Sequence, residues 1–397
     1  MQTMSWINTK PMEEKIKFIR AWQSGQYTVS DLCNAHNISR TTGHRLIRKF
    51  NQEGEKCFFE KSKCPKNIPN KTSPKIEKAI IKLRKKYKLW GARKLMKLLE
   101  QQIPINQIPS ETTVNAILKR NGFVKARRKR GHKVEKLNPK FDPNSCNEIW
   151  SADYKGKFRL GNKRYCNPLT ICDSKSRFLF TSKGHYNPTY KAVKQEFTRV
   201  FKKYGLPVFM HTDNGSPFGS IQAIQRFSKL PYWLIDLGIH PVFSDPGCPQ
   251  QNGRHERMHK DLKAFCVNPP RATLRKQQIL MDKFVKEYNE VRPHEALDMF
   301  TPKQIHQLSN KTFPVKIIDY DYPFDFKKLK VSKNGTLRWG AYQWVYISRG
   351  AIQRIIGIQE IGNGIWKVFY RNVFLGYFDE KLINRKEQYL KLSKIIV

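Results

Sequence analysis

The spacing of apolar residues changes twice along this chain, and that change limits the folds that the chain can adopt. As far as about residue 122, apolar side chains recur at helical intervals, as in Met12, Ile16 and Ile19. From Trp150 onward, short runs typical of strands alternate with amphipathic segments, and beyond Pro302 the pattern turns to strand-like runs again. The pattern predicts a multidomain protein, with all-α modules first, an α/β domain next and a β-rich carboxyl end.

Residues 1–60 are expected to form a helix-turn-helix domain. Gly25 ends a first helical stripe, a second short helix follows, and Ser39 stands at the N-cap position of a third. In this motif the last helix lies in the major groove and presents polar side chains to base edges. Its candidate DNA contacts are Arg40, Thr41, Thr42, His44, Arg45 and Arg48. A generic basic helical hairpin is the alternative that fits the same spacing.

A second helical module is predicted for residues 75–122, after a linker rich in Pro and Lys. Ser110 is placed to cap the last helix of this module, and Gly122 is placed to end it. The module is a candidate second DNA-binding domain.

Residues 123–145 are expected to form a basic linker. From Lys119 to Lys136 the sequence holds nine basic residues and one acidic residue. A segment of this charge can lie along phosphates and release their counterions, so Arg127, Arg128 and Arg130 are candidate DNA contacts. A solvated linker or a nuclear-targeting tract produces the same pattern.

The charge of the whole chain points to an anionic partner. Lys and Arg number 75 against 32 Asp and Glu, which gives a net charge of +43 over 397 residues. A codon bias toward Lys would not by itself deplete Asp and Glu, so nucleic acid is the favoured partner. The sequence has no apolar run of the length that spans a membrane, and its eight Cys lack zinc-ribbon spacing. We therefore expect no membrane partner and a cytoplasmic location.

The segment from 146 to 305 predicts an α/β domain built on a mixed five-stranded sheet. The expected strands cover 150–158, 165–171, 177–180, 206–211 and 239–243, and the expected helices cover 192–204, 221–237 and 250–265. The remaining segment, 315–397, predicts a small antiparallel β-barrel. Its expected strands cover 336–339, 343–347, 354–359, 364–370 and 373–378, with Asn334-Gly335 as a turn.

Three acidic residues of the α/β domain stand in unusual settings. Asp153 lies within the first predicted strand, Asp213 follows the fourth, and Glu256 lies on the last predicted helix. A carboxylate in a core strand is destabilising unless it is paired or binds a metal. Three carboxylates are hard ligands suited to Mg²⁺ or Mn²⁺, and two such ions can support phosphodiester chemistry. Taken singly, Asp213 also fits a turn residue and Glu256 a surface charge.

Several motifs resemble the integrase-type DDE transposases of bacterial insertion sequences, and most closely the branch numbered four-eight-one. The motifs are Tyr154-Lys155 after Asp153, the run His-Thr-Asp-Asn-Gly-Ser-Pro-Phe at 211–218, the run Gln-Asn-Gly-Arg-His-Glu-Arg-Met-His at 251–259, the run at 288–297 and Thr301-Pro302. The resemblance covers most of the chain. One departure is the spacing of the last two acids, because 42 residues separate Asp213 from Glu256 (256 − 213 − 1), whereas many integrases have about 35. Asp173 resembles a non-catalytic Asp of the family.

The resemblance implies a ribonuclease-H-like, retroviral-integrase-like core in which Asp153, Asp213 and Glu256 are catalytic and bind two Mg²⁺ ions, with Mn²⁺ as a substitute. It implies cleavage at the ends of a mobile DNA element, followed by attack of the freed 3′ hydroxyl on target DNA. The implied partners are double-stranded DNA, namely the terminal inverted repeats and the target, and further copies of the chain. The expected location is the bacterial cytoplasm, on the nucleoid when the protein is bound to DNA.

Two cations on the helix of Glu256 are further candidate DNA contacts. Lys260 and Lys263 follow Glu256 at i+4 and i+7, so one helical face carries all three side chains. An ordinary Glu-to-Lys pair on a helix surface is the alternative.

Two other functions compete with the transposase interpretation. The segment from His255 to His259 satisfies the H-E-x-x-H pattern of zinc metalloproteases. Arg254 and Arg257 oppose that interpretation, because their positive charges repel a bare dication. A non-catalytic DNA-binding repressor, or the remnant of a transposase, is the second alternative, although the chain retains all three acids.

Overall fold

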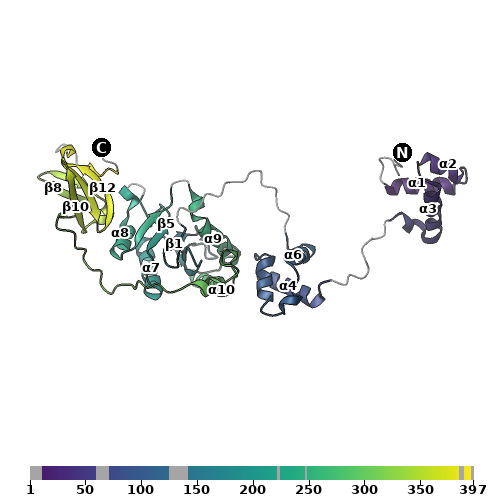
Figure 1. Cartoon of the computed structure of the whole chain (residues 1–397), viewed down its shortest axis with the longest axis horizontal. Helices are drawn as coiled ribbons and strands as arrows, with labels where there is room; N and C mark the ends of the chain where they lie inside the picture. Colours follow the sequence, from purple (N-terminus) through teal and green to yellow (C-terminus); the bar gives the residue numbers. More distant parts are fainter. Residues whose placement is uncertain are drawn as a thin grey trace. The chain divides into compact units, whose positions relative to one another are not determined.

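The structure is a computed structural model that describes residues 11–59, 71–124, 142–220, 224–245, 248–383 and 389–394. The chain divides into two compact units, Met1–Thr72 and Ser73–Val397. Figure 1 shows the order of the elements along the chain, from purple at the amino end to yellow at the carboxyl end. Within the described ranges, no helix is both long and apolar enough to cross a membrane.

The first unit is a three-helix domain. It contains α1 (Pro11–Gln23), α2 (Val29–Ala35), α3 (Arg40–Glu53) and the 3₁₀ turn η1 (Gly54–Phe58). Ser39 caps α3 as predicted, because its hydroxyl accepts a hydrogen bond from the Thr42 N–H at 3.2 Å. Gly43 lets α3 approach its neighbours closely, since a Cβ there would lie 2.4 Å from Cys33 Sγ. The core is formed by Phe18, Ile19 and their neighbours.

The second helical module opens the second unit. It contains α4 (Pro74–Lys86), α5 (Ala92–Leu99), the 3₁₀ turn η2 (Ile105–Gln107) and α6 (Glu111–Arg120). Ser110 caps α6 by accepting a hydrogen bond from the Thr113 N–H at 3.4 Å, and Gly122 adopts a positive φ of 74° just beyond the helix. Ile80, Leu95 and Val114 are fully buried and bring the three helices together. The predicted cap and stop are confirmed.

The central domain is built on a mixed sheet. Its strands are β1 (Ile149–Tyr154), β2 (Phe158–Arg159), β3 (Tyr165–Asp173), β4 (Leu179–His185), β5 (Phe209–Thr212) and β6 (His240–Phe243). The order is β4-β3-β1-β5-β6, with β3 antiparallel to β1 and β4, and with β5 parallel to β1 and β6. The two-residue β2 pairs with β3 close to the register of β1. It therefore extends β1, and the sheet is five strands wide as predicted.

Helices cover both faces of this sheet. On one face, α7 (Tyr190–Tyr204) and α8 (Lys229–Asp236) pack against Trp150, Leu169 and Ile171. On the other face, α9 (Gly253–Cys266) and α10 (Leu274–Glu290) pack against Cys166 and Leu179. Because side chains alternate along a strand, Asp153 and Thr170 face the same side as α9.

Several element boundaries differ from the predictions. The predicted helix 221–237 is shorter, because α8 begins only at Lys229, after the 3₁₀ turn η3 (Ile224–Arg226). The last predicted helix begins at Gly253, and the 3₁₀ turn η4 (Pro249–Asn252) precedes it. The strand predicted at 177–180 is β4, which continues to His185. Its second half is polar, so the apolar pattern did not reveal its full length.

The sequence pattern did not predict α10. This helix carries two amide side chains that bond the sheet's edge strand. Asn289 accepts a hydrogen bond from the Leu179 N–H at 2.9 Å and donates one to the Leu179 carbonyl at 2.8 Å. Gln278 forms the equivalent pair with the Gly184 N–H and the Ser182 carbonyl. The helix therefore satisfies backbone polar groups on the edge of β4 that pairs with no other strand in the described residues. The turn η5 (Glu295–Leu297) and α11 (Pro302–Ile305) follow it.

The carboxyl end forms two β-sheets around one core. The strands are β7 (Lys327–Lys330), β8 (Thr336–Gly340), β9 (Gln343–Tyr346), β10 (Ile355–Gly362), β11 (Ile365–Tyr370), β12 (Val373–Asp379) and β13 (Leu390–Lys391), with turns η6 (Arg349–Ala351) and η7 (Glu380–Leu382). The sheet orders are β12-β11-β10-β7 and β13-β9-β8. Over the described residues the strands do not close into a barrel, because consecutive β7 and β8 belong to different sheets. The β-rich prediction is confirmed and the closed barrel is not.

Candidate active site

Two of the three predicted acids occupy equivalent positions on neighbouring parallel strands. Ser151 of β1 stands opposite His211 of β5 in the sheet register. Two residues further along each strand come Asp153 and Asp213, the latter just beyond the end of β5. Adjacent strands are about 4.8 Å apart, so this register brings the two carboxyl groups to the same end and the same face of the sheet.

The amino end of α9 lies against Asp153. Asn252 Nδ2 is 3.4 Å from Asp153 Oδ2, and His259 Nδ1 is 3.8 Å from the same oxygen. Glu256 lies in the first turn of this helix, between the two His residues that face the sheet, and its side chain is exposed. The structure therefore brings Glu256 into the neighbourhood of Asp153 without direct contact between their carboxyl groups.

A buried hydrogen-bond network holds α9 on the sheet. The Thr170 hydroxyl donates to the Asp153 carbonyl at 3.0 Å and is 2.7 Å from Nε2 of both His255 and His259. Because this hydroxyl has one proton, the geometry assigns Nε2–H donors to both imidazoles. The Cys172 thiol then donates to His255 Nδ1 at 3.3 Å. Sequence reasoning missed Thr170, whose role depends on a partner 85 residues away.

Burial and the neighbouring acids raise the pKa of Asp153. The pKa of Asp153 rises from its usual value to about 7, first because the carboxyl group is buried and then because Asp213 is near, with a smaller contribution from Glu256. Partial burial also raises the pKa of Asp213, although a hydrogen bond from the Gly215 backbone opposes the shift. The negative charges of Asp213 and Glu256 therefore both act on Asp153.

Among the described residues, no three His, Cys, Asp or Glu side chains converge closely enough to form a ready metal-binding group. The donor chemistry nevertheless fits a hard dication, because the three acids supply carboxylate oxygens only. The raised pKa of Asp153 reflects burial first and then neighbouring negative charge, and a dication would offset that charge. Closing the set requires a movement of Glu256, whose exposed side chain is free of core packing.

The H-E-x-x-H pattern does not form a zinc-protease site. His255 and His259 are 1% and 6% exposed, and both direct Nε2 to Thr170 inside the core. Burial lowers the pKa of His259 to about 3 and that of His255 well below its usual value, so both are neutral structural residues. The exposed Glu256 lies outside this pair.

Asp173 is a structural residue, in agreement with its exclusion from the triad. It is fully buried and accepts hydrogen bonds from the Asn147 N–H at 3.0 Å and the Ser176 N–H at 2.7 Å. The Ser176 hydroxyl donates to the same carboxylate at 2.6 Å. These bonds hold the turn between β3 and β4 on the start of β1.

The predicted DNA contacts of the first domain share one helix. Arg40, Thr41, His44, Arg45 and Arg48 are exposed on α3, and Thr42 is half-buried. The Thr42 side chain also pairs with the capping hydroxyl of Ser39 at 2.9 Å, so it is less available to DNA than the others.

The other predicted DNA contacts divide between the basic linker and α9. Lys260 and Lys263 are exposed on α9. Arg127, Arg128 and Arg130 lie outside the described residues.

Models of known protein families match the helical modules and the central domain. Two models of the integrase core domain match residues 143–249 and 237–302, which hold Asp153, Asp213 and Glu256. Residues 143–302 therefore carry an integrase core domain, and this match supports an integrase-type transposase. A helix-turn-helix model matches residues 14–56, and a homeodomain-like model matches residues 42–118.

Insertion-element proteins are similar to this chain. An uncharacterized 31.7 kDa protein of insertion element IS407 from Burkholderia multivorans is 23% identical over 238 residues, or 59% of this chain and 82% of the relative. An uncharacterized protein of insertion element IS136 from Agrobacterium fabrum is 35% identical over 97 residues, or 23% of this chain and 45% of the relative. The chain thus spans less than half of the second relative. The element names differ from the predicted branch four-eight-one, which stays a prediction.

Solved integrase structures are also similar. The magnesium complex of the HTLV-2 integrase catalytic core domain, in its trimeric form, has 17% identity and a TM-score of 0.33, and the match covers 42% of this chain and all of that chain. A simian T-cell lymphotropic virus intasome with a PP2A regulatory subunit has 14% identity and a TM-score of 0.36. The match covers 77% of this chain and 97% of that chain. The family matches favour neither the protease nor the repressor alternative.

Proposed function

We propose that this transposase binds the ends of its DNA element, cleaves them in a metal-dependent reaction and joins them to target DNA. The observation that carries the proposal is the register of β1 and β5, in which Asp153 and Asp213 each follow the Ser151–His211 pair by two residues, with Asn252 of the turn before α9 next to Asp153. Two carboxylates at the carboxyl ends of neighbouring strands, with a third on a nearby helix, suit phosphodiester chemistry with divalent ions.

Asp153, Asp213 and Glu256 are the proposed holders of two Mg²⁺ ions, with Mn²⁺ as a substitute. Glu256 completes the set when its exposed side chain turns toward the two aspartates. When bound, the ions would activate an attacking oxygen and stabilise the leaving oxygen. The Asn252 amide contacts the Asp153 carboxyl group from the α9 side.

Exposed cations bring the DNA to this site. Lys260 and Lys263 lie on the exposed part of α9, one and two turns beyond Glu256, where they can contact the phosphates next to the scissile bond. The side chains of α3, from Arg40 to Arg48, are proposed to read the terminal repeat in the major groove. The basic segment with Arg127, Arg128 and Arg130 is proposed to follow the phosphate backbone between the domains.

The proposed assembly is a homo-oligomer on DNA, because two element ends must be joined to the target in one event. The proposed location is the bacterial cytoplasm, on the nucleoid. The net charge of +43 supports a nucleic-acid partner for the whole chain.

The test is cleavage and joining of a labelled duplex that ends in the element's terminal repeat, with Mg²⁺ present. We expect Asp213→Asn to lower the rate at least about a thousandfold, because the change removes one ligand charge. Asp319→Asn is the matched control, since Asp319 is exposed and lies outside the central sheet. An Asp213→Asn protein that still forms the product at the control's rate would refute the assignment.

A further inference from the structure

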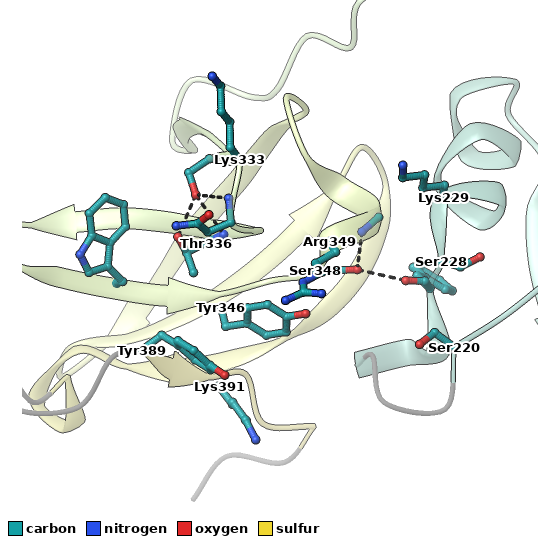
Figure 2. A pocket seen from close by; sticks show the side chains of 15 residues that line it. Ser220, Ser228, Lys229, Lys333, Thr336, Tyr346, Ser348, Arg349, Tyr389 and Lys391 are labelled. Carbon is teal, nitrogen blue, oxygen red and sulfur yellow. Dashed lines mark hydrogen bonds between the residues drawn. The ribbon is translucent and has the colours of Figure 1, made fainter. Parts of the chain in front are cut away.

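An open cavity separates the central domain from the carboxyl-terminal sheets. Its volume is about 1450 Å³, which is larger than the 300–1,000 Å³ typical of small-ligand pockets. One wall comes from Ser220 and the start of α8, and the other comes from β8, β9, β13 and the turn η6. Figure 2 shows side chains from both walls directed toward the space between them.

Aromatic rings line the carboxyl-terminal wall. Trp344 and Tyr346 are two residues apart on β9 and therefore share one face of the strand. The Tyr389 ring lies beside the Tyr346 ring, with centroids 5.2 Å apart and planes 36° apart (Figure 2). Tyr389 is 40% exposed. Aromatic rings in an open, polar cavity offer their faces to planar ligands such as nucleic-acid bases.

Positive charges surround these rings. Lys229, Lys333, Arg349 and Lys391 line the cavity and are exposed, and none of the described lining residues is acidic. In Figure 2, Lys229 and Lys391 come from opposite walls. A ligand that combines planar rings with several negative charges fits this lining, and a nucleotide chain has that chemistry.

Close packing holds the two walls together. A Cβ at Gly350 would lie 2.7 Å from the backbone carbon of Ser228, and the Ser348 hydroxyl donates to the Phe227 carbonyl at 3.1 Å (Figure 2). Arg354 donates to Asp236 of α8 at 2.8 Å, and the Tyr370 hydroxyl donates to the same carboxylate. The cavity is therefore a built feature of the interface and needs no rearrangement to exist.

We propose that this cavity binds an unpaired stretch of DNA strand, with bases stacked on Tyr346, Tyr389 and Trp344 and phosphates held by the four cations. In a duplex the base faces are already stacked on one another, so the rings would have no base face to contact. The inference rests on the proposed function for the choice of DNA over RNA. It adds a site for a separated strand, apart from the carboxylates.

The experiment measures the anisotropy of a labelled oligothymidylate on the full chain, with EDTA present. We expect Tyr346→Ala and Tyr389→Ala each to weaken binding about tenfold, as the loss of one stacked base predicts. Tyr342→Ala is the matched control, because Tyr342 is 82% exposed on the β8–β9 turn and lies outside the cavity lining. Lys391→Glu is expected to weaken binding more than Lys381→Glu, which makes the same charge change outside the lining.

A cross-linking experiment tests whether the bound DNA strand lies in the cavity. An oligothymidylate carrying 5-iododeoxyuridine is expected to cross-link, on irradiation, to the peptides that contain Tyr346 or Tyr389. Should Tyr346→Ala fail to fold, the exposed Tyr389 and the cross-link carry the test.

Three results would overturn the proposal. In the first, the cavity variants bind the oligothymidylate as tightly as Tyr342→Ala does. In the second, the cavity variants lose as much affinity for a duplex as for the single strand. In the third, the protein binds an oligoribonucleotide more tightly than the oligothymidylate. The measurement needs neither metal nor cleavage, so its outcome does not depend on whether Asp213→Asn abolishes the reaction.

Discussion

The side chain of Asp153 illustrates how function is set against stability in this protein. Its carboxyl group is buried next to Asp213, and its pKa of about 7 means that it ionises only near neutral pH. Above that pH the metal-free site holds neighbouring negative charges that the unfolded chain would separate. A dication is the natural counter-charge, so the residue that costs stability in the free protein is the one expected to bind metal.

This leads to a prediction for Asp153→Asn in the metal-free protein. The folded pKa is raised above the unfolded value, so the folded state binds the proton more tightly, and stability is lost as pH rises from about 4 to about 7. At pH 8 the substitution should therefore raise the free energy of unfolding by up to about 4 kcal/mol, and near pH 4 it should have little effect. Urea denaturation at the two pH values, with EDTA present, measures the difference. An equal effect at both pH values would contradict the raised pKa.

At the scale of single elements, α3 is the part expected to read DNA sequence. Arg45→Ala is predicted to weaken binding to the terminal repeat by about 1–3 kcal/mol, because an exposed Arg on this helix can form a bidentate contact with a base. Arg20→Ala is the control, with the same charge change on the exposed surface of α1. Competition between the repeat and an unrelated duplex measures the effect, and equal losses for the two variants would argue against α3.

The helix α10 allows a test of edge protection. Asn289→Ala should lower the free energy of unfolding by about 2–3 kcal/mol, because the buried N–H and carbonyl of Leu179 would lose their partners. Lys286→Ala, on the exposed side of the same helix, should change it by less than about 0.5 kcal/mol. Denaturant unfolding of the two variants supplies the comparison, and equal midpoints would show that the amide bonds contribute nothing.

The elements also show which parts of the fold the sequence could predict. Caps, turns and periodic stripes are local, so the caps Ser39 and Ser110 and the positions of the central strands along the chain were accessible from the sequence. The helix α10 was not predicted, and its buried polar residues such as Gln277 hide the apolar stripe. The closed barrel was over-predicted, because turns indicate neighbouring strands but not which sheet each strand joins.

For the candidate site, the sequence indicated the three acids but not the residues that hold α9 and Asp153 in place. Asp153 and Asp213 could be placed at strand ends because their neighbours form recognisable strand patterns. Thr170, Asn252 and His259 carry no local signal, since each acts through a partner far away in the chain. The H-E-x-x-H pattern likewise needed the fold to show that its His residues are buried against Thr170.

Across the whole molecule, buried neutral histidines predict sensitivity to acid. Burial lowers the pKa of His294 to about 2 and that of His259 to about 3, and lowers that of His255 as well. The unfolded chain binds these protons near pH 6.5 and the folded chain does not, so stability is lost as pH falls below about 6.5. The loss is about 1.4 kcal/mol per pH unit for each His. Unfolding between pH 7 and pH 5 measures the slope, which should become shallower in His294→Gln; an unchanged slope would contradict the assignment.

The central claim is that Asp153, Asp213 and Glu256 hold divalent ions next to the DNA backbone. The most direct measurement is anomalous diffraction from crystals of the full chain bound to a terminal-repeat duplex and soaked in Mn²⁺. The account predicts two Mn²⁺ peaks within coordination distance of these three carboxylates, with the Glu256 side chain turned inward. Peaks elsewhere, or an ordered complex in which Glu256 still points into solvent, would contradict it.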